Sequence, residues 1–220
     1  MFSILELVLS PIVWLMEGLL ALYVSIIPSF GFCIILLSFS LSFLLLPIQI
    51  RLRQTELSVS KKIQKIDKEL SLIDKNIKGE ERFFLLEEIY KNNSYHPIHS
   101  IGLGASFFLL LPILISSVLL FTQEEIVKGI QFLIINDLSK PDSLMGAINI
   151  LPFIMFLITL VDARFRFRGD NKSQMKFLFI SFVLFLLVYK LPAALILYWI
   201  SNNLFSFFLE VVKKFKEQKE

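Results

Sequence analysis

The chain has 220 residues, of which 55% are hydrophobic and 19% charged, and it carries a net charge of +3. Soluble domains are about 45–50% apolar and about 25% charged, so this composition excludes a disordered protein and an ordinary soluble enzyme. The single cysteine, Cys33, excludes an intrachain disulfide, and with it a disulfide-stabilised secreted module.

Residues 1–29 are largely apolar, and Ser3, Glu6, Ser10 and Glu17 recur among them at helical spacing. Serine at position 10 followed by Pro11 is typical of a helix start. The narrow polar stripe favours a helix lying in the membrane interface, and a sixth span is the alternative. No lysine or arginine precedes the apolar residues, so we do not expect a secretory signal.

Five further apolar stretches predict transmembrane helices, at residues 30–50, 98–121, 144–163, 177–190 and 192–212. A bilayer core about 30 Å thick needs roughly 20 helical residues, and the third stretch is slightly short. Residues 177–209 contain one charge, Lys190, followed by Leu191 and Pro192. A single helix over these residues would be about 50 Å long, so we predict two short spans joined by a tight turn near Pro192.

The basic residues are distributed unevenly between the loops. Residues 51–91, 164–176 and 213–219 contain 19 of the 22 lysines and arginines, which leaves Lys128, Lys140 and Lys190 for the other side. Because short cytoplasmic loops are enriched in basic residues, we predict an amino terminus outside and a basic tail, 213–220, inside. The positive charge is then a signal of topology, and we expect no direct nucleic-acid recognition.

The segment 51–97 has a helical pattern of its own. Apolar residues three and four apart predict a helix with one apolar seam, formed by Ile63, Ile66, Leu70, Ile73 and Ile77. A second helix, from Glu80 to about Lys91, offers Phe83, Leu86, Ile89 and Tyr90. We predict a cytoplasmic helical hairpin, with a solvated charged connector as the alternative. The fold class is therefore an all-α integral membrane protein with five transmembrane helices, an interfacial helix and this hairpin.

No arrangement of residues predicts covalent catalysis, a cofactor or a metal site, so we do not expect an enzyme. His96 and His99 are three residues apart, but Pro97 interrupts helical geometry between them. No carboxylate or cysteine at ligand spacing joins the two histidines. The serines of the first span have no histidine–acid partners.

Polar side chains inside the apolar stretches form the candidate site instead. Polar groups in lipid need partners, so we predict a hydrated groove toward the cytoplasmic half of the spans. Its candidate lining residues are Ser38, Ser42, Gln49, Asn149, Thr159, Asp162, Tyr198, Trp199 and Asn203. The alternative for the serines is helix packing and hydrogen bonding to a carbonyl of the same helix. The alternative for Asp162 is an interfacial acid near Arg164 and Arg166.

The order of elements and a series of local motifs resemble the YidC-type membrane protein insertases, with their mitochondrial and chloroplast relatives. The matching motifs are Pro47 after the first span, Tyr90-Lys91 with His96-Pro97-Ile98, Pro112-Ile113, Asn136-Asp137-Leu138-Ser139 with Pro141-Asp142, Pro192-Ala193-Ala194-Leu195, Leu197-Tyr198-Trp199 and Asn203-Leu204-Phe205. Each motif is weak alone, and their common order is specific. The resemblance covers most of the chain.

Several residues depart from the family pattern. The resemblance implies an arginine five residues before the proline of the first span, where this chain has Ser42. The asparagine expected before Pro97 is His96, and leucines replace a glutamine shortly before Pro112. A glutamine near the end of the third span corresponds roughly to Asp162. Attraction of acidic client segments by a groove arginine therefore cannot be carried over to this chain.

The resemblance implies an insertase or chaperone in the bacterial cytoplasmic (inner) membrane, acting on nascent or newly made membrane proteins through a groove open to cytoplasm and lipid. The hairpin would receive the client or the ribosome. A non-insertase accessory subunit of another membrane complex is the main alternative, because Ser42 replaces the arginine. A small-solute transporter is a weaker one, because the chain shows neither duplicated halves nor paired broken helices.

Overall fold

A computed structural model describes residues 4–72, 79–93, 95, 105–146, 148–166 and 171–217. The chain forms two units, residues 1–44 with 113–220 and residues 45–112, which we call the larger unit and the hairpin unit. Apart from two isolated β-bridges, the regular structure of the described residues is helical. This confirms the predicted all-α class.

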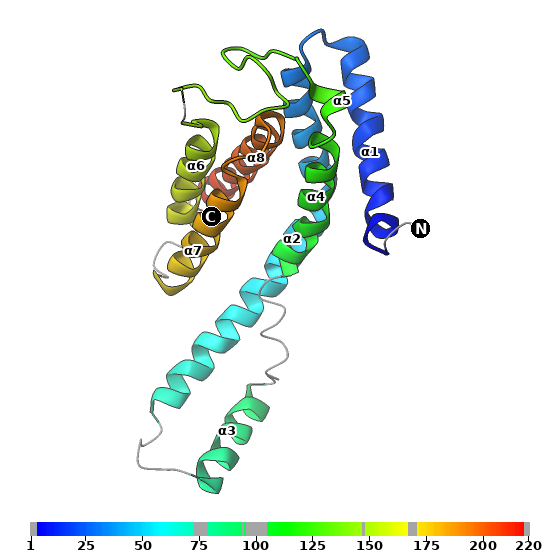
Figure 1. Cartoon of the computed structure of the whole chain (residues 1–220). Helices are drawn as coiled ribbons and strands as arrows, with labels where there is room; N and C mark the ends of the chain where they lie inside the picture. Colours follow the sequence, from blue (N-terminus) through cyan, green and yellow to red (C-terminus); the bar gives the residue numbers. More distant parts are fainter. Residues whose placement is uncertain are drawn as a thin grey trace. The chain divides into compact units, whose positions relative to one another are not determined.

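The larger unit contains most of the helices (Figure 1). They are α1 (Ile4–Ile26), the first part of α2 (Phe30–Ser71), the last part of α4 (Ala105–Phe121), α5 (Glu124–Val127), α6 (Leu151–Arg166), α7 (Asn171–Val188) and α8 (Ala193–Glu217). α6 packs against both α7 and α8. The break predicted near Pro192 lies between α7 and α8.

Within the described part of the chain, three helices are long and apolar enough to cross a membrane, over Leu9–Ile26 in α1, Phe30–Leu52 in α2 and Ala193–Val212 in α8. The last two correspond to the first and fifth predicted spans. Shorter apolar stretches, Leu111–Phe121 and Phe177–Val188, belong to the second and fourth, and residues 98–104 of the second lie outside the described part of the chain. The total of five spans and the interfacial position of residues 1–29 stay predictions.

α1 buries one face in the larger unit, through Leu9, Met16 and Leu20. The Tyr23 hydroxyl lies 2.6 Å from the Ser40 hydroxyl and links α1 to α2. The rest of α1 exposes large apolar side chains such as Trp14. A surface of this kind fits contact with hydrocarbon.

The core of the larger unit is concentrated where α2 and α8 begin and where α4 ends. Its fully buried side chains include Ile34, Leu37, Leu120, Phe121, Leu138, Leu195, Ile196 and Tyr198. Gly31 belongs to this region, because the Phe132 ring occupies the position that a Cβ on residue 31 would take. Further along the same two helices, Phe43 and Phe208 are exposed. The unit is thus densely packed at one end and more open toward the other.

α6 begins at Leu151, seven residues later than the predicted third span. Asp142 is the reason, because its carboxylate accepts backbone hydrogen bonds from Ile150 at 2.7 Å and Leu151 at 3.0 Å. These N–H groups belong to the first turn of a helix and have no partner within it. Before α6, Met145 pairs with Ile148 in a turn that has Gly146 at φ +69°.

Aromatic side chains fill the contact between α6 and α7. Phe153 lies 5.0 Å from Phe185, and Phe156 lies 5.5 Å from Phe185, between ring centroids. Tyr189 and Phe182 extend the same cluster. Edge-on and tilted rings add favourable quadrupole contacts to their apolar burial. Part of the high phenylalanine content is used in this seam.

The hairpin unit contains the remainder of α2 and α3 (Glu80–Asn92). α2 continues as one helix through Pro47 to Ser71, so the first predicted hairpin helix is an extension of the first span. Ile66 is buried on its seam, whereas Phe83 of α3 is 63% exposed. The Asn93 amide donates to the Glu69 carboxylate at 2.7 Å, so the end of α3 meets the end of α2. Ile73 and Ile77 lie outside the described residues.

Candidate functional site

Two hydrogen bonds between side chains and neighbouring helices tie α2, α4 and α8 together in the larger unit. The Ser38 hydroxyl donates to the Tyr198 carbonyl at 3.0 Å, and both groups are buried. The Trp199 indole N–H donates to the Ser117 hydroxyl at 2.9 Å. Consecutive residues of α8 thus bind to two different helices. We call these four residues, with Ser42 and Ser116, the hydroxyl layer.

Three hydroxyl groups of this layer are buried without a hydrogen-bond partner among the described residues. They are the side-chain oxygens of Ser42, Ser116 and Tyr198. Ser42 is 3% exposed and Ser116 is fully buried. A buried hydroxyl without a partner costs about 1–3 kcal/mol, and buried water is the usual partner where protein groups supply none. This layer has the polarity to bind water and carries no charged group.

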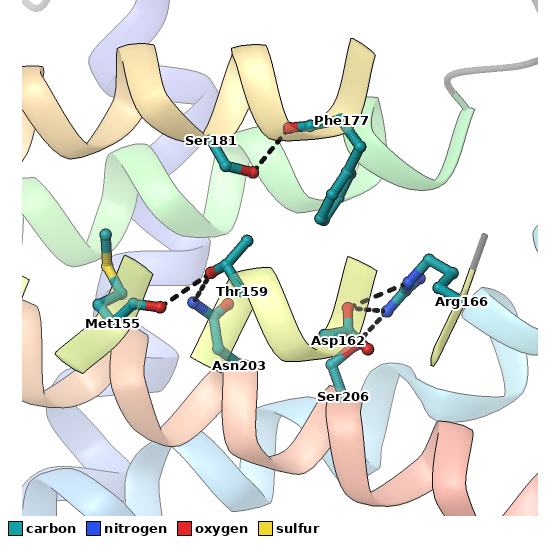
Figure 2. A network of polar contacts seen from close by, with 8 residues as sticks. All are labelled: Met155, Thr159, Asp162, Arg166, Phe177, Ser181, Asn203 and Ser206. Atoms are coloured by element: carbon teal, nitrogen blue, oxygen red, sulfur yellow. Dashed lines mark hydrogen bonds and ion pairs between the residues drawn. The ribbon is translucent and has the colours of Figure 1, made fainter. Parts of the chain in front are cut away.

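A second polar cluster links α6, α7 and α8 (Figure 2). The Arg166 guanidinium donates two hydrogen bonds to one oxygen of Asp162, at 2.9 and 3.1 Å. It also donates to the Ser206 hydroxyl of α8 at 2.9 Å and lies 5.9 Å from the centre of the Phe177 ring. Three residues before Asp162, the Thr159 hydroxyl accepts a hydrogen bond from the Asn203 amide at 3.2 Å. We call this the ion-pair cluster.

The negative charge of Asp162 is therefore neutralised by Arg166 within the cluster. Its side chain is 8% exposed and that of Arg166 is 24% exposed. A buried carboxylate without a counter-ion would be strongly destabilising, and the pair avoids that cost. This geometry matches the alternative interpretation of Asp162 as an acid paired with a nearby arginine.

Helical rise separates the two clusters along the unit. At 1.5 Å per residue, Tyr198 lies about 8 Å and Ser38 about 12 Å from the beginnings of their helices. Arg166 and Ser206 lie about 20 Å or more from the beginnings of α6 and α8. The hydroxyl layer is thus nearer the densely packed end, with Ser42 on its deeper side, and the ion-pair cluster is nearer the other end.

Asn149 does not join either cluster, because it precedes α6. Its side-chain amide donates to the Tyr189 carbonyl at 2.8 Å, and its oxygen accepts from the Ser143 N–H at 3.1 Å. Asn149 thus fixes the loop before α6 to the end of α7. Gln49 belongs to the hairpin unit.

The loop between α4 and α6 is held by a second, partly exposed hydrogen-bond network. The Asp137 carboxylate accepts from the Ser139 hydroxyl at 2.7 Å and from the Gly129 and Ser139 N–H groups. The Ser139 hydroxyl is the largest influence that lowers the pKa of Asp137 to about 2 from its usual 3.8, and Lys140 adds to it. The loop carbonyls of Leu138 and Lys140 in turn accept the first N–H groups of α8, at 3.0 and 2.8 Å.

An apolar hollow of about 420 Å³ lies on the outer side of α2 and α8, lined by Phe39, Ser40, Phe43, Leu44 and Phe205. Its Ser40 hydroxyl is already bonded to Tyr23. Phe39 and Phe205 contact each other across it at 5.9 Å between ring centroids. The hollow can accept an apolar group and offers no free charge.

The sequence predicted seven of these contact residues and missed others. Ser117, Ser116, Ser206 and the buried Glu210 were not predicted. Arg166 was considered only as a neighbour of Asp162, although its spacing of four residues was the signal for an ion pair on one helix face. Ser201 bonds a carbonyl of its own helix, as the alternative for the serines proposed, and Thr159 does the same.

Among the described residues, no group of three or more histidine, cysteine or acidic side chains could hold a metal ion. His96 and His99 lie outside the described part of the chain. Cys33 is a free, buried thiol. The side chains of the described residues therefore offer hydrogen bonding, ion pairing and apolar contact.

Apolar helices of membrane-spanning length, held together by buried hydroxyl and ion-pair contacts, define an all-helical integral membrane protein. The model of the family described as 60Kd inner membrane protein matches residues 22–220. The chain therefore belongs to this family, which confirms the resemblance to the YidC-type proteins.

Relatives named membrane protein insertase YidC include one from Clostridium tetani (strain Massachusetts / E88). It is 26% identical over 197 residues, which cover 87% of this chain and 84% of the relative. A second, from Janthinobacterium sp. (strain Marseille), is 24% identical and aligns with 92% of this chain. This chain spans only 36% of that longer relative.

A solved structure supports the same fold. It is described as "Active YidC insertase crystal structure with the first transmembrane domain resolved". It is similar with a TM-score of 0.58 and 20% identity, over 94% of this chain and 46% of that one. At this identity the likeness establishes the fold and leaves the function to the residues of this chain.

Proposed function

We propose that this protein is a membrane protein insertase and chaperone, which lowers the barrier for client transmembrane segments. Moving a polar segment through hydrocarbon costs several kcal/mol for each unsatisfied group. A hydrated groove, open to cytoplasm and lipid, offers these groups partners while the client's apolar helix moves into the bilayer. The proposal applies to a chain that spans about a third of the length of its longer relatives.

The observation that carries the proposal is the set of buried hydroxyls without partners on α2, α4 and α8, next to a densely packed end. Water at Ser42, Ser116 and Tyr198 would satisfy these groups. The packed end, where Phe121 contacts Tyr198 at 5.8 Å between ring centroids, would limit the depth of the groove. A recess wet on one side and sealed on the other shortens the polar path across the membrane.

The polar residues also favour a class of client. The hydroxyl layer has no charge, and Arg166 is engaged by Asp162 and Ser206. A neutral groove offers hydrogen bonds but no attraction for acidic residues. We therefore propose clients whose translocated segments are short and uncharged. The remaining groove candidates are the weakest, because Asn149 precedes α6 and bonds to Tyr189, and Gln49 belongs to the hairpin unit.

Reconstitution tests the activity directly. The purified protein in liposomes should increase protease-protected insertion of a single-span client with a short uncharged translocated segment, relative to liposomes without it. Two aspartates added to that segment should reduce insertion several-fold. Equal insertion with and without the protein, for every client tested, would contradict an insertase.

Cysteine labelling tests the groove separately. In a Cys33→Ala background, Ser42→Cys should react with a membrane-impermeant maleimide added from the cytoplasmic side. Leu157→Cys, on a residue of α6 that is 61% exposed in the unit, is the lipid-facing control. Equal inertness of both cysteines would show that Ser42 does not contact water. A positively charged thiol reagent at the same cysteine should raise insertion of the aspartate-containing client.

The replacement of the family's arginine by Ser42 supports a second candidate, an accessory subunit of another membrane complex. Purification in mild detergent distinguishes the two. One stoichiometric partner, without ribosomes or nascent chains, supports the accessory subunit. Recovery of ribosome–nascent chain complexes supports the insertase.

We also propose that the protein lies with its amino terminus outside and its carboxyl terminus inside, with α1 in the membrane interface. The uneven distribution of basic residues supports this orientation. An amino-terminal epitope accessible only from the cytoplasm would instead make α1 a sixth span. The length of Leu9–Ile26 permits either arrangement.

A further inference from the structure

The loop between α4 and α6 exposes large apolar side chains at a tight turn. Phe132 and Ile135 exchange two backbone hydrogen bonds, of 3.0 and 2.9 Å. Both of these residues are buried, and the two residues between them form the tip of the turn. Leu133 is 81% exposed and Ile134 is 73% exposed.

A second turn in the same loop exposes apolar side chains at the paired positions themselves. Met145 and Ile148 exchange backbone hydrogen bonds of 3.3 Å. Gly146, with φ +69°, provides the left-handed residue of the turn. Met145 is 68% exposed and Ile148 is 47% exposed. Two turns of one loop thus expose large apolar side chains, the first at its tip and the second at its paired residues.

The first tip is held outward by the backbone. Leu133 has φ +51°, in the left-handed region that side chains other than glycine and asparagine rarely adopt. The Leu138 N–H donates to the Ile130 carbonyl at 2.9 Å, and the Asp137 carboxylate fixes Gly129 and Ser139. Hydrogen bonds on both sides of the turn thus hold Leu133 and Ile134 in their exposed positions.

The loop lies at the level where two candidate spans begin. Phe132 packs edge-on against Phe32 of α2, with ring centroids 5.3 Å apart, and its ring covers Gly31. The carbonyls of Leu138 and Lys140 accept the first N–H groups of α8. Because the candidate span of α2 begins at Phe30 and that of α8 at Ala193, this level would be the boundary of the hydrocarbon if both helices cross the membrane.

We propose that Leu133, Ile134 and Met145 insert into the boundary between headgroups and acyl chains, in the leaflet where α2 and α8 begin. The occupant is lipid, because Phe32 continues the exposed apolar surface from the turn onto the flank of a span. Apolar residues beside polar loop groups are typical of segments that rest at this depth. The turns then fix the depth of the bundle in the membrane, independently of any insertase activity.

Fluorescence quenching in the full chain tests this. In a Cys33→Ala background, Ile134→Cys and Met145→Cys are each labelled with bimane and reconstituted in phosphatidylethanolamine–phosphatidylglycerol vesicles. Asn136→Cys, an exposed polar position of the same loop, is the matched control. Quenching is measured with lipids carrying a shallow doxyl group and with aqueous iodide.

We expect at least two-fold stronger quenching by the doxyl lipid at positions 134 and 145 than at 136, with at least two-fold weaker quenching by iodide. Doxyl and iodide quenching equal at all three positions would place the tips in water and overturn the proposal. Protection from iodide without doxyl quenching would overturn it in favour of a protein partner or a second copy of the chain. Circular dichroism of each labelled variant verifies that the helices are retained.

Discussion

The contact between Gly31 and Phe132 gives a prediction whose sign is opposite to the usual rule. Replacing a glycine inside a helix by alanine normally stabilises the helix by about 1 kcal/mol. At Gly31 the new Cβ would instead lie inside the contact distance of three ring carbons of Phe132. Phe132 is 5% exposed and its backbone is bonded to Ile135 in both directions, so the ring has little room to move.

Overpacking of a buried site costs about 1–3 kcal/mol, and the rigidity of the turn places Gly31→Ala at the upper end. Subtracting the gain in helix propensity leaves a net loss of about 2 kcal/mol. For a chain of this length each kcal/mol shifts Tm by about 2–4 °C, so we expect Tm to fall by about 4–8 °C. Gly18→Ala, where no atom lies within 4 Å of the added Cβ, should raise Tm by a few degrees.

Thermal unfolding of both variants in the same detergent, followed by circular dichroism, measures this difference. The double variant Gly31→Ala/Phe132→Leu should lose less than the sum of the two single losses, because the smaller side chain makes room for the Cβ. A Gly31→Ala variant as stable as Gly18→Ala would refute the reasoning. So would strict additivity of the two single changes.

Three further predictions concern the polar networks. Asp142→Ala should destabilise the protein by about 1–3 kcal/mol by leaving the N–H groups of Ile150 and Leu151 without their acceptor, and hydrogen exchange at the start of α6 should accelerate. The pKa of Asp137 is lowered to about 2, so its ionised form contributes stability that is complete above about pH 4 and is lost as the pH falls toward 2. In Asp137→Asn this part of the dependence of Tm on pH should disappear. An unchanged pH profile in this variant would contradict the prediction. Arg166→Met should lower the stability of the folded protein by about 3 kcal/mol, because Asp162 is left buried without its cation. Arg164 is exposed, so Arg164→Met should change Tm little. Equal shifts of Tm for the two variants would argue against a buried pair.

The apolar helices and the break near Pro192 could be predicted because they depend on local composition. Runs of apolar residues and a proline after a charge are visible without knowing which helices are neighbours. The ion pair of Asp162 and Arg166 was also within reach, since a spacing of four residues places both side chains on one helix face.

The beginning of α6 and the two polar clusters could not be predicted in the same way. Asp142 accepts hydrogen bonds from residues eight and nine positions later, through a turn that depends on the loop conformation. Ser38 meets a carbonyl 160 residues away, and Trp199 meets a serine 82 residues away. Periodicity indicates that such side chains face inward, but the partner depends on how the helices pack.

The first N–H groups of α8 have carbonyl acceptors in a loop that precedes the helix by more than 50 residues, at Leu138 and Lys140. During synthesis this loop leaves the ribosome well before α8 does. The carbonyls of Leu138 and Lys140 lack these donors until α8 is made, so the loop and the start of α8 should fold together. Assembly of the larger unit should be cooperative and vectorial. A chain shortened to end before Pro192 should lose protection of the loop amides as well as the missing helix.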